Sequence, residues 1–172
     1  LQLIAAYRLR GHQKAQLDPL GLAEREHVAD LELAFHELSS ADFETVFQAG
    51  SLHIGKADAP LGEIYTALEE TYCNTIGAEF MHIVDTQERH WVMRRMESVR
   101  SSPDYSEEVC LNLLTHLINA EGLEKSLASK YPGTKRFGLE GGESLIPMLS
   151  EAVQRTGAYK AQEIVIGMAH RG

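Results

Sequence analysis

Cysteine is scarce in this sequence, since only Cys73 and Cys110 occur among 172 residues. Two isolated cysteines are too few for a disulfide framework or a zinc cluster, so a reducing compartment is the default expectation. Long apolar runs are also missing, because no stretch approaches the roughly 20 residues that a helix needs to span a bilayer. We therefore expect neither a disulfide-rich nor a membrane-spanning protein.

Basic residues are outnumbered, with 16 Lys and Arg against 25 Asp and Glu, which gives a formal net charge of −9. Binding to DNA or RNA through released counterions needs a basic face, so a nucleic-acid partner is disfavoured. The same charge gives no polybasic attraction to anionic lipids, so no membrane partner is expected. Apolar residues make up 44% and charged residues 24%, which is an ordinary composition for a folded globular chain.

Apolar residues recur at helical spacing through most of the first 128 residues, which predicts a mainly helical region. The first expected helix ends near Gly11, and the second and third span 41–48 and 61–76. The fourth runs from Asp85 to a break at 101–103, and the fifth runs from Ser106 to a kink or end near Gly122. Capping residues support these limits, because Asp58 and Pro60 suit the start of the third helix and Gly77 suits its end. Asp85 and Glu88 resemble a capping box at the start of the fourth.

The same spacing predicts which side chains of three helices face a core. The inward positions are Leu61, Ile64, Leu68, Tyr72 and Ile76 in one helix, Trp91, Val92, Met96 and Val99 in the next, and Val109, Cys110, Leu113, Leu114, Leu117 and Ile118 in the last.

The character of the sequence changes near residues 128–131. A glycine-rich link over 135–142 leads to a predicted helix over 144–155, which tolerates Pro147 in its first turn. A β-branched run at 164–166 then predicts a strand. Loop, helix, loop and strand in this order indicate an α/β unit. We therefore predict a helical region at 1–128 and the opening of an α/β domain at 129–172. Because a lone strand needs partners, we expect this chain to be an internal fragment.

His170 and Arg171 follow the predicted strand in a turn between Gly167 and Gly172. Loops at the carboxyl ends of strands carry the functional side chains of open α/β sheets. A histidine there can hydrogen-bond a carboxylate or move a proton near neutral pH, and an arginine offers a fork of donors to phosphate or carboxylate. A solvated polar turn is the more common explanation for such a pair when no other information is available.

The glycines of 139–143 can form a backbone nest before a helix, which is a natural anion site. Glu140 and Glu143 argue against phosphate at this place, so a tight turn is the favoured interpretation. The sequence has no complete GxGxxG or Walker A pattern, and its other histidines share no metal-ligand spacing. No metal-binding residue is therefore predicted.

Several stretches together carry a resemblance to a known family. They are Tyr7–His12 (YRLRGH), Asp18–Leu20 (DPL), Leu68–Gly77 (LEETYCNTIG), Glu79–Ile83 (EFMHI), Lys135–Leu149 (KRFGLEGGESLIPML) and Ile164–Gly172 (IVIGMAHRG). In these the sequence resembles the thiamine-diphosphate-dependent first component of 2-oxoglutarate dehydrogenase, along essentially its whole length. The family has an α/β thiamine-diphosphate-binding fold. The resemblance implies that this fragment is mainly α-helical, with the first strand of the α/β domain near its C-terminus.

The family reaction decarboxylates 2-oxoglutarate and passes the succinyl group to a lipoyl arm, with thiamine diphosphate and Mg²⁺ as cofactors. By resemblance, His170 is a catalytic residue that hydrogen-bonds the substrate and helps to select its distal carboxylate. Arg171 approaches thiamine diphosphate, and Phe137 is an aromatic wall of the substrate pocket. The ligands of the metal and the diphosphate are expected downstream of this segment, so the fragment alone is expected to be inactive.

The resemblance implies 2-oxoglutarate and the lipoylated dihydrolipoyl succinyltransferase as partners, a homodimer, and a role in the tricarboxylic acid cycle. It is compatible with bacterial cytoplasm or the mitochondrial matrix. Two alternatives stay open within the same chemistry: a 2-oxoadipate dehydrogenase, and a decarboxylase that needs no lipoyl partner. A third alternative, of another class, is a non-catalytic helical docking scaffold, although a strand followed by His-Arg-Gly is not needed for docking.

Overall fold

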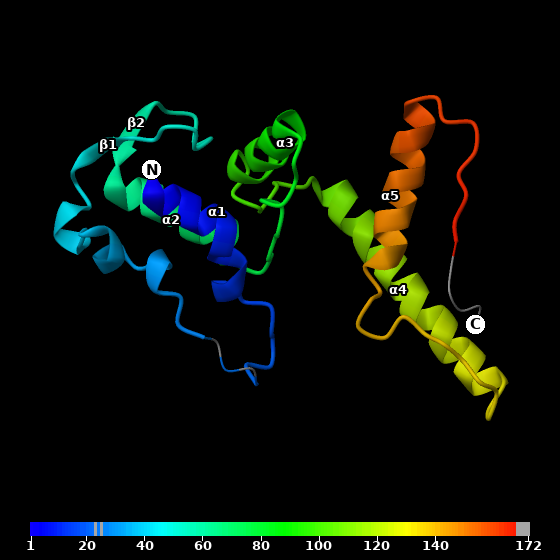
Figure 1. The fold of residues 1–172 in the computed structure, drawn as a ribbon. Helices are drawn as coiled ribbons and strands as arrows, with labels where there is room; N and C mark the ends of the chain where they lie inside the picture. Colours follow the sequence, from blue (N-terminus) through cyan, green and yellow to red (C-terminus); the bar gives the residue numbers. More distant parts are fainter. Residues whose placement is uncertain (23, 25, 168–172) are drawn as a thin grey trace. The chain divides into compact units, whose positions relative to one another are not determined.

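The computed structural model describes residues 1–22, 24 and 26–167 (Figure 1). The chain divides after Asp104 into two compact units, called unit 1 and unit 2 below. Among the described residues the fold is mainly helical and has one two-stranded sheet. This confirms the predicted helical character of the segment. In the part of the chain that is described, no helix combines the length and apolar character needed to cross a membrane.

The described residues of unit 1 form three α-helices, three short 3-10 helices and one antiparallel strand pair. Its elements are α1 (Gln2–Lys14), η1 (Ala29–Leu31), η2 (Leu33–His36), η3 (Ser40–Asp42), β1 (Val46–Gln48), β2 (Asp58–Pro60), α2 (Leu61–Tyr72) and α3 (Thr86–Glu97). The strands pair with Phe47 opposite Ala59. Strand β2 contacts α2, which follows it without a loop.

The core of unit 1 lies between α1 and α2. Tyr7, Leu68 and Tyr72 are fully buried there. Gly11 permits this close packing, because a Cβ at that position would lie 2.5 Å from the Cβ of Tyr72. A side chain at position 11 would therefore push the two helices apart.

The helix predicted over 41–48 is wrong. The structure has only the 3-10 turn η3 there, followed by β1. Ser39 and Asp42 form a reciprocal cap that closes a single turn. Beyond it, Val46 and Phe47 are β-branched and aromatic residues that pair with β2, and this pairing satisfies their backbone groups better than an isolated helical turn would.

Helix α2 starts at Leu61 as predicted but ends at Tyr72, so Gly77 does not cap it and Ile76 lies beyond its end. The N–H of Gln16, which follows α1, donates to the Asn74 carbonyl at 2.7 Å. This contact holds the chain after α2 in a non-helical path. The predicted inward face is otherwise confirmed, since the apolar residues from Leu61 to Tyr72 at helical spacing are buried.

Helix α3 begins as predicted, because the Asp85 side chain accepts a hydrogen bond from the Glu88 N–H at 2.8 Å. Its predicted inward face is wrong for Trp91, which is 66% exposed. Met93 and Glu97 are the buried residues instead. Glu97 is drawn inward by polar partners from other elements, and this rotates Trp91 to the solvent side.

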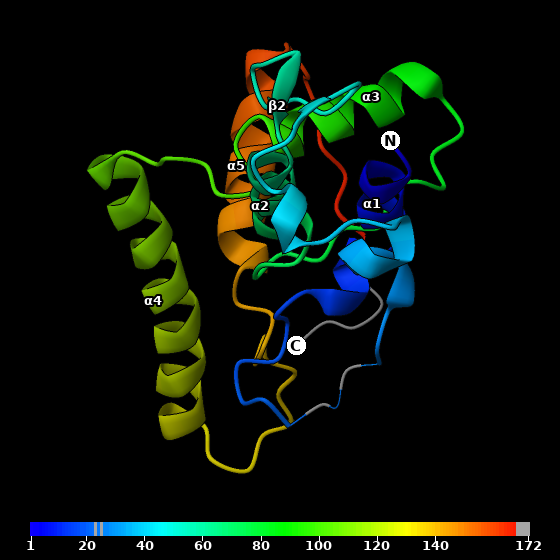
Figure 2. The same ribbon diagram turned by 90° about the vertical axis from the view of Figure 1, so that its left-hand side faces the viewer.

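The part of unit 2 that the structure describes forms the helices α4 (Glu107–Lys130) and α5 (Leu145–Ala158). Ser106 caps α4 by accepting a hydrogen bond from the Val109 N–H. The predicted kink or end near Gly122 is wrong, and Figure 2 shows α4 as one uninterrupted helix. A glycine costs a helix only about 1 kcal/mol relative to alanine, which good helix formers on both sides can offset.

The burial predicted for α4 is also wrong, since none of its residues is buried. Of the six residues expected to face a core, Leu113 is half-buried and the other five are exposed: Val109, Cys110, Leu114, Leu117 and Ile118. Helical spacing shows that a side of the helix is apolar, but a core also needs a partner to cover that side. Within the described part of unit 2, α5 is the helix that contacts α4, and it leaves most of the apolar side of α4 exposed.

Helix α5 carries Pro147 in its first turn, as predicted, and extends a few residues further than expected, through Gly157 to Ala158. The strand predicted at 164–166 is not formed, and the described residues after α5 are coil. A strand requires a neighbour to pair with its backbone groups, and no strand of unit 2 is present among the described residues. The domain boundary proposed near residue 129 falls inside unit 2 and stays a prediction about the longer protein.

Candidate functional site

The three residues predicted for the site fall in unit 2. His170 and Arg171 lie outside the described residues. Phe137 lies in the link between α4 and α5, and its side chain is exposed. Whether the three side chains come together therefore remains a prediction.

Phe137 lines a cavity of about 380 Å³ between the link and the C-terminal half of α4. Leu123 and Leu127 of α4 contribute the apolar part of the lining, and Arg136 adds a cationic group next to Phe137. The Arg136 guanidinium also donates to the Tyr131 carbonyl at 3.1 Å, which fixes the start of the link. The cavity thus offers one aromatic wall and an aliphatic floor, and its rim carries two cations and four carboxylates: Lys125, Arg136, Glu121, Glu124, Glu140 and Glu143.

Carboxylates surround the glycines of the link. The Leu139 N–H donates to Glu124 at 2.6 Å, and the Gly141 N–H donates to Glu143 at 3.1 Å. These backbone donors are the groups that a phosphate nest would need, and carboxylates of the same chain already use them. The interpretation as a tight turn, and not an anion site, is therefore the one that the geometry supports.

The described residues do not suit Mg²⁺ or a diphosphate. No cluster of at least three His, Cys, Asp or Glu side chains in the described part of the chain is placed to hold a metal ion. The link near Phe137 is acidic, and its available N–H groups are paired as described above. Any cofactor ligands must therefore come from other residues.

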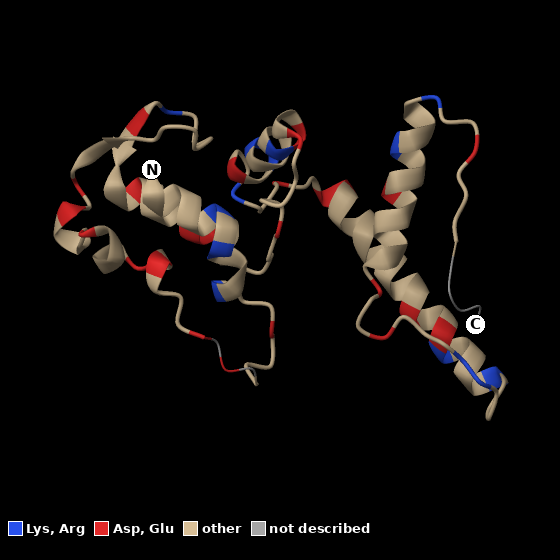
Figure 3. Cartoon of the chain, in the orientation of Figure 1, with Lys and Arg blue, Asp and Glu red and all other residues tan. Residues whose placement is uncertain are grey.

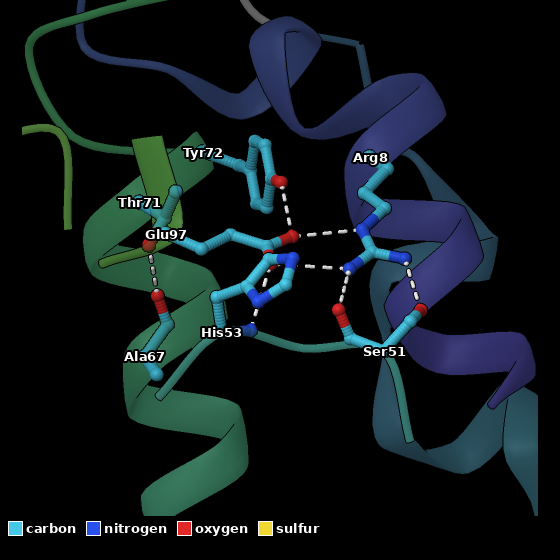
Figure 4. A network of polar contacts seen from close by, with 7 residues as sticks. All are labelled: Arg8, Ser51, His53, Ala67, Thr71, Tyr72 and Glu97. Atoms are coloured by element: carbon cyan, nitrogen blue, oxygen red, sulfur yellow. Dashed lines mark hydrogen bonds and ion pairs between the residues drawn. The ribbon is translucent and has the colours of Figure 1, made fainter. Parts of the chain in front are cut away.

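The most highly organised polar cluster lies in unit 1, around Glu97 (Figure 4). The Arg8 guanidinium donates to both oxygens of the Glu97 carboxylate, from Nε at 2.8 Å and from Nη2 at 3.1 Å. The Tyr72 hydroxyl donates to Oε1 at 2.6 Å, and the His53 backbone N–H donates to Oε2 at 2.9 Å. Ser51 accepts from the remaining side of the guanidinium through its hydroxyl and its carbonyl, each at 2.8 Å.

Burial and charge act against each other in this cluster. Burial by itself lowers the pKa of Arg8, but the hydrogen bonds and charge of Glu97 outweigh it and the pKa is raised. Burial also raises the pKa of Tyr72, and the neighbouring carboxylate raises it further. Arg8 therefore stays charged and Tyr72 stays neutral at physiological pH.

The cluster is a structural clamp and not a reaction centre. Both oxygens of Glu97 are paired, and the Arg8 guanidinium is bonded on both sides, so no group is left to bind or attack a ligand. The clamp ties α1, the segment of Ser51 and His53, α2 and α3 together. Sequence analysis missed it, although one signal was present: Arg8 and Tyr72 both stand in the stretches that carry the family resemblance.

A second, partly buried contact joins α1 to α2. The Tyr7 hydroxyl donates to the Glu69 carboxylate, and the Lys14 ammonium donates to the same oxygen at 3.0 Å. Burial and the Glu69 hydrogen bond raise the pKa of Tyr7. Tyr7 belongs to the same resembling stretch as Arg8, so this stretch stabilises unit 1 through both residues.

No family model matches the chain. The chain is similar along its whole length to curated proteins named 2-oxoglutarate dehydrogenase E1 component. It is 59% identical over 172 residues to the protein of Azotobacter vinelandii, with 100% of the chain and 18% of that protein covered. It is 48% identical over 171 residues to the protein of Cupriavidus necator, with 99% and 18% covered. It is 45% identical over 174 residues to the protein of Brucella anthropi, with 100% and 17% covered.

Proposed function

This chain belongs to the family of 2-oxoglutarate dehydrogenase E1 components, of which it spans about 18% of the length, and on that premise we propose that it serves the decarboxylation of 2-oxoglutarate. The observation that carries the proposal is the identity of 59% that extends over all 172 residues. A match of this extent includes the stretches Lys135–Leu149 and Ile164–Gly172, in which the proposed site residues stand. The activity is that of the longer protein.

Within that activity, we assign the recognition of substrate to His170 and Phe137. 2-Oxoglutarate carries two carboxylates, and the distal one needs a polar partner where water is excluded. A histidine donor at His170 supplies that partner. Phe137 supplies an aromatic wall, which its position in the lining of a cavity beside Leu123 and Leu127 supports.

Thiamine diphosphate, when bound, supplies a ring that accepts the electrons released with carbon dioxide. The described residues hold no cluster of three or more His, Cys, Asp or Glu side chains placed for Mg²⁺, and carboxylates of the same chain pair the N–H groups of Leu139 and Gly141 that a diphosphate would need. Arg171, which can form a fork of hydrogen bonds to an anion, is the one residue assigned to its neighbourhood.

The partners proposed for the longer protein are those of the family. The succinyl group passes to the lipoyl arm of the dihydrolipoyl succinyltransferase within the tricarboxylic acid cycle, and the enzyme works as a homodimer. The relatives come from bacteria, which favours bacterial cytoplasm over the mitochondrial matrix.

The proposal is tested by a substrate panel on the longer enzyme supplied with thiamine diphosphate and Mg²⁺. Release of carbon dioxide is measured from 2-oxoglutarate, 2-oxoadipate and 2-oxovalerate with an artificial electron acceptor. The expected result is the highest kcat/KM with 2-oxoglutarate. A higher kcat/KM with 2-oxoadipate would assign the protein to that substrate, and no turnover of any 2-oxo acid would reject an enzymatic role.

Addition of the lipoylated succinyltransferase and CoA then tests the transfer step. Succinyl-CoA is expected as the product. Decarboxylation that never yields succinyl-CoA would instead support an enzyme that is independent of lipoyl groups.

A further inference from the structure

The link between α4 and α5 is held by hydrogen bonds on both sides of Phe137. Before this residue, the Arg136 guanidinium donates to the Tyr131 carbonyl at 3.1 Å. After it, the Leu139 N–H donates to the Glu124 carboxylate at 2.6 Å, across 15 positions of the sequence. The first contact joins two residues of the link, whereas the second ties the link to α4.

Glu124 stands at a place on α4 that suits this contact. It is half-buried, whereas the other charged residues of the helix are exposed: Glu107, Glu108, Glu121, Lys125 and Lys130. Figure 3 shows the acidic residues of α4 and of the link in red. The residues four positions away on the same side, Ala120 and Ala128, are also half-buried. A carboxylate that is partly removed from water needs a hydrogen-bond donor, and the Leu139 N–H supplies one.

Gly138 leaves room for the carboxylate to reach the backbone of the link. A Cβ at this position would lie 2.7 Å from one oxygen of Glu124 and closer still to one of Glu140. A side chain there would therefore displace the carboxylate groups. Because Gly138 directly follows Phe137, the Glu124 carboxylate lies against the backbone next to the aromatic residue.

The same elements form the cavity that Phe137 lines. Glu124 is also part of that lining, as are Leu123 and Leu127. Because the link has no regular secondary structure around Phe137, its path depends on contacts of this kind. A misplacement of about 1 Å in a group that positions the substrate can reduce turnover on the order of 10²-fold. Loss of the Glu124 contact would therefore affect the reaction through Phe137.

We propose that Glu124 is a positioning residue for the decarboxylation: it holds the link so that Phe137 forms a wall of the pocket for 2-oxoglutarate. This rests on the proposed function, in which Phe137 contacts the substrate. Glu124 acts by accepting the Leu139 N–H. That role requires an acceptor oxygen at the end of a side chain of this length, and it does not require a negative charge.

Variants of the longer enzyme, assayed with thiamine diphosphate and Mg²⁺ bound, test the proposal. Glu124→Met removes the acceptor at nearly the same side-chain length, and Glu124→Gln keeps it. Glu108→Met is the matched control, since Glu108 is an exposed acid of the same helix outside the cavity lining. Glu124→Asp replaces Glu124→Met if that variant does not fold, because its carboxylate is one methylene too short for the contact.

The kinetic expectation separates positioning from a merely structural role. In Glu124→Met, kcat/KM for 2-oxoglutarate should fall by about 10- to 10²-fold. In Glu124→Gln and Glu108→Met it should stay within about threefold of the wild type. In a Phe137→Ala background, Glu124→Met should have almost no further effect, because the effects of residues that act together do not add. Equal losses in Glu124→Met and Glu124→Gln, or an undiminished loss in the Phe137→Ala background, would overturn the proposal.

Hydrogen exchange of the link, followed without substrate by mass spectrometry of fragments that contain Leu139, tests the hydrogen bond itself. The Leu139 amide should exchange about 10-fold faster in Glu124→Met than in the wild type or in Glu124→Gln. Unchanged exchange would overturn the proposal. If the wild type turns over no 2-oxo acid, the proposed function fails and this proposal fails with it. If the wild type is active and the Glu124 variants match it, only the assignment of Glu124 fails.

Discussion

Single residues in unit 1 show how a buried charge is tolerated. Arg8 and Glu97 are both buried, and every polar atom of the pair has a partner. Pairing in the interior repays a desolvation cost and gives little net stability. Loss of one partner has a much larger effect, because the other charge is left buried and unpaired.

We expect Glu97→Ala to destabilise unit 1 by about 3–5 kcal/mol, the usual cost of breaking a buried ion pair. Glu63→Ala is the matched control, since it breaks the more exposed pair with Lys56 and should cost about 0–1 kcal/mol. Urea unfolding followed by the fluorescence of Trp91, the only tryptophan, measures both changes in unit 1. Equal losses of stability in the two variants would show that the buried contacts of Glu97 stabilise unit 1 no more than an exposed ion pair does.

The two cysteines differ in burial, because Cys73 is buried and Cys110 is exposed. Burial and the charge of Glu69 raise the pKa of Cys73 to about 12 from an ordinary value of 9.0. Because the folded state holds this proton more tightly than the unfolded chain does, the stability that the thiol contributes is complete below about pH 9. It is lost as pH rises from 9 toward 12. Cys110 is exposed and offers a control.

We therefore expect the free energy of unfolding of unit 1 to fall as the pH rises from 9 toward 12, and Cys73→Ala to make that fall shallower. Cys110→Ala should leave the slope unchanged. Urea titrations at several pH values in this range measure the slopes. If Cys73→Ala and Cys110→Ala give identical slopes, Cys73 does not titrate as a buried thiol.

At the scale of secondary-structure elements, the sequence predicts those features, such as helix starts, that depend only on residues close together in the chain. Asp85 and Ser106 each cap the helix that follows, and Pro147 lies in a first turn, because these features involve only residues a few positions apart. Which side of a helix is buried depends instead on residues far away in the sequence. Trp91 is exposed because Arg8, 89 residues before Glu97, draws Glu97 and not Trp91 into the core.

Glycines within helices provide a matched pair for testing these packing arguments. Gly11→Ala places a Cβ 2.5 Å from the Cβ of Tyr72, whereas Gly122→Ala meets nothing within 4 Å. We expect the first substitution to destabilise unit 1 by about 1–3 kcal/mol through overpacking. The second should stabilise α4 by about 0.5–1 kcal/mol through helix propensity.

Thermal unfolding followed by circular dichroism, together with Trp91 fluorescence for unit 1, separates the two effects. A loss of stability in Gly122→Ala would show that the chain bends or is crowded at that point. A neutral Gly11→Ala would show that α1 and α2 are not in close contact there.

At the scale of the whole molecule, the two units differ in how far they are complete. Unit 1 has a continuous apolar core and satisfied buried charges. Among its own described helical residues unit 2 buries one, Pro147, and the residues at 164–166 are exposed. The sequence predicts the family of the chain and, by resemblance to that family, the candidate site residues. It could not predict their geometry, because the path of a loop depends on residues far away in the sequence: Phe137 stands in a link without regular secondary structure, and His170 and Arg171 lie outside the described residues.

From this difference we expect no measurable binding of thiamine diphosphate to residues 1–172 alone, with or without Mg²⁺. Isothermal titration of the segment, with the longer enzyme as a positive control, measures it. Tight magnesium-dependent binding by the segment would contradict the conclusion that its described residues lack the ligands.

The central claim is that this segment supplies the residue that selects 2-oxoglutarate, and His170→Ala in the longer enzyme tests it most directly. A site built around a polar contact discriminates strongly, because the wrong partner leaves buried groups unpaired. With bound cofactor confirmed, kcat/KM for 2-oxoglutarate should fall by about 10²-fold or more. Turnover of 2-oxovalerate, which lacks the distal carboxylate, should fall much less or rise. Equal losses on both substrates, or no loss on either, would contradict the claim.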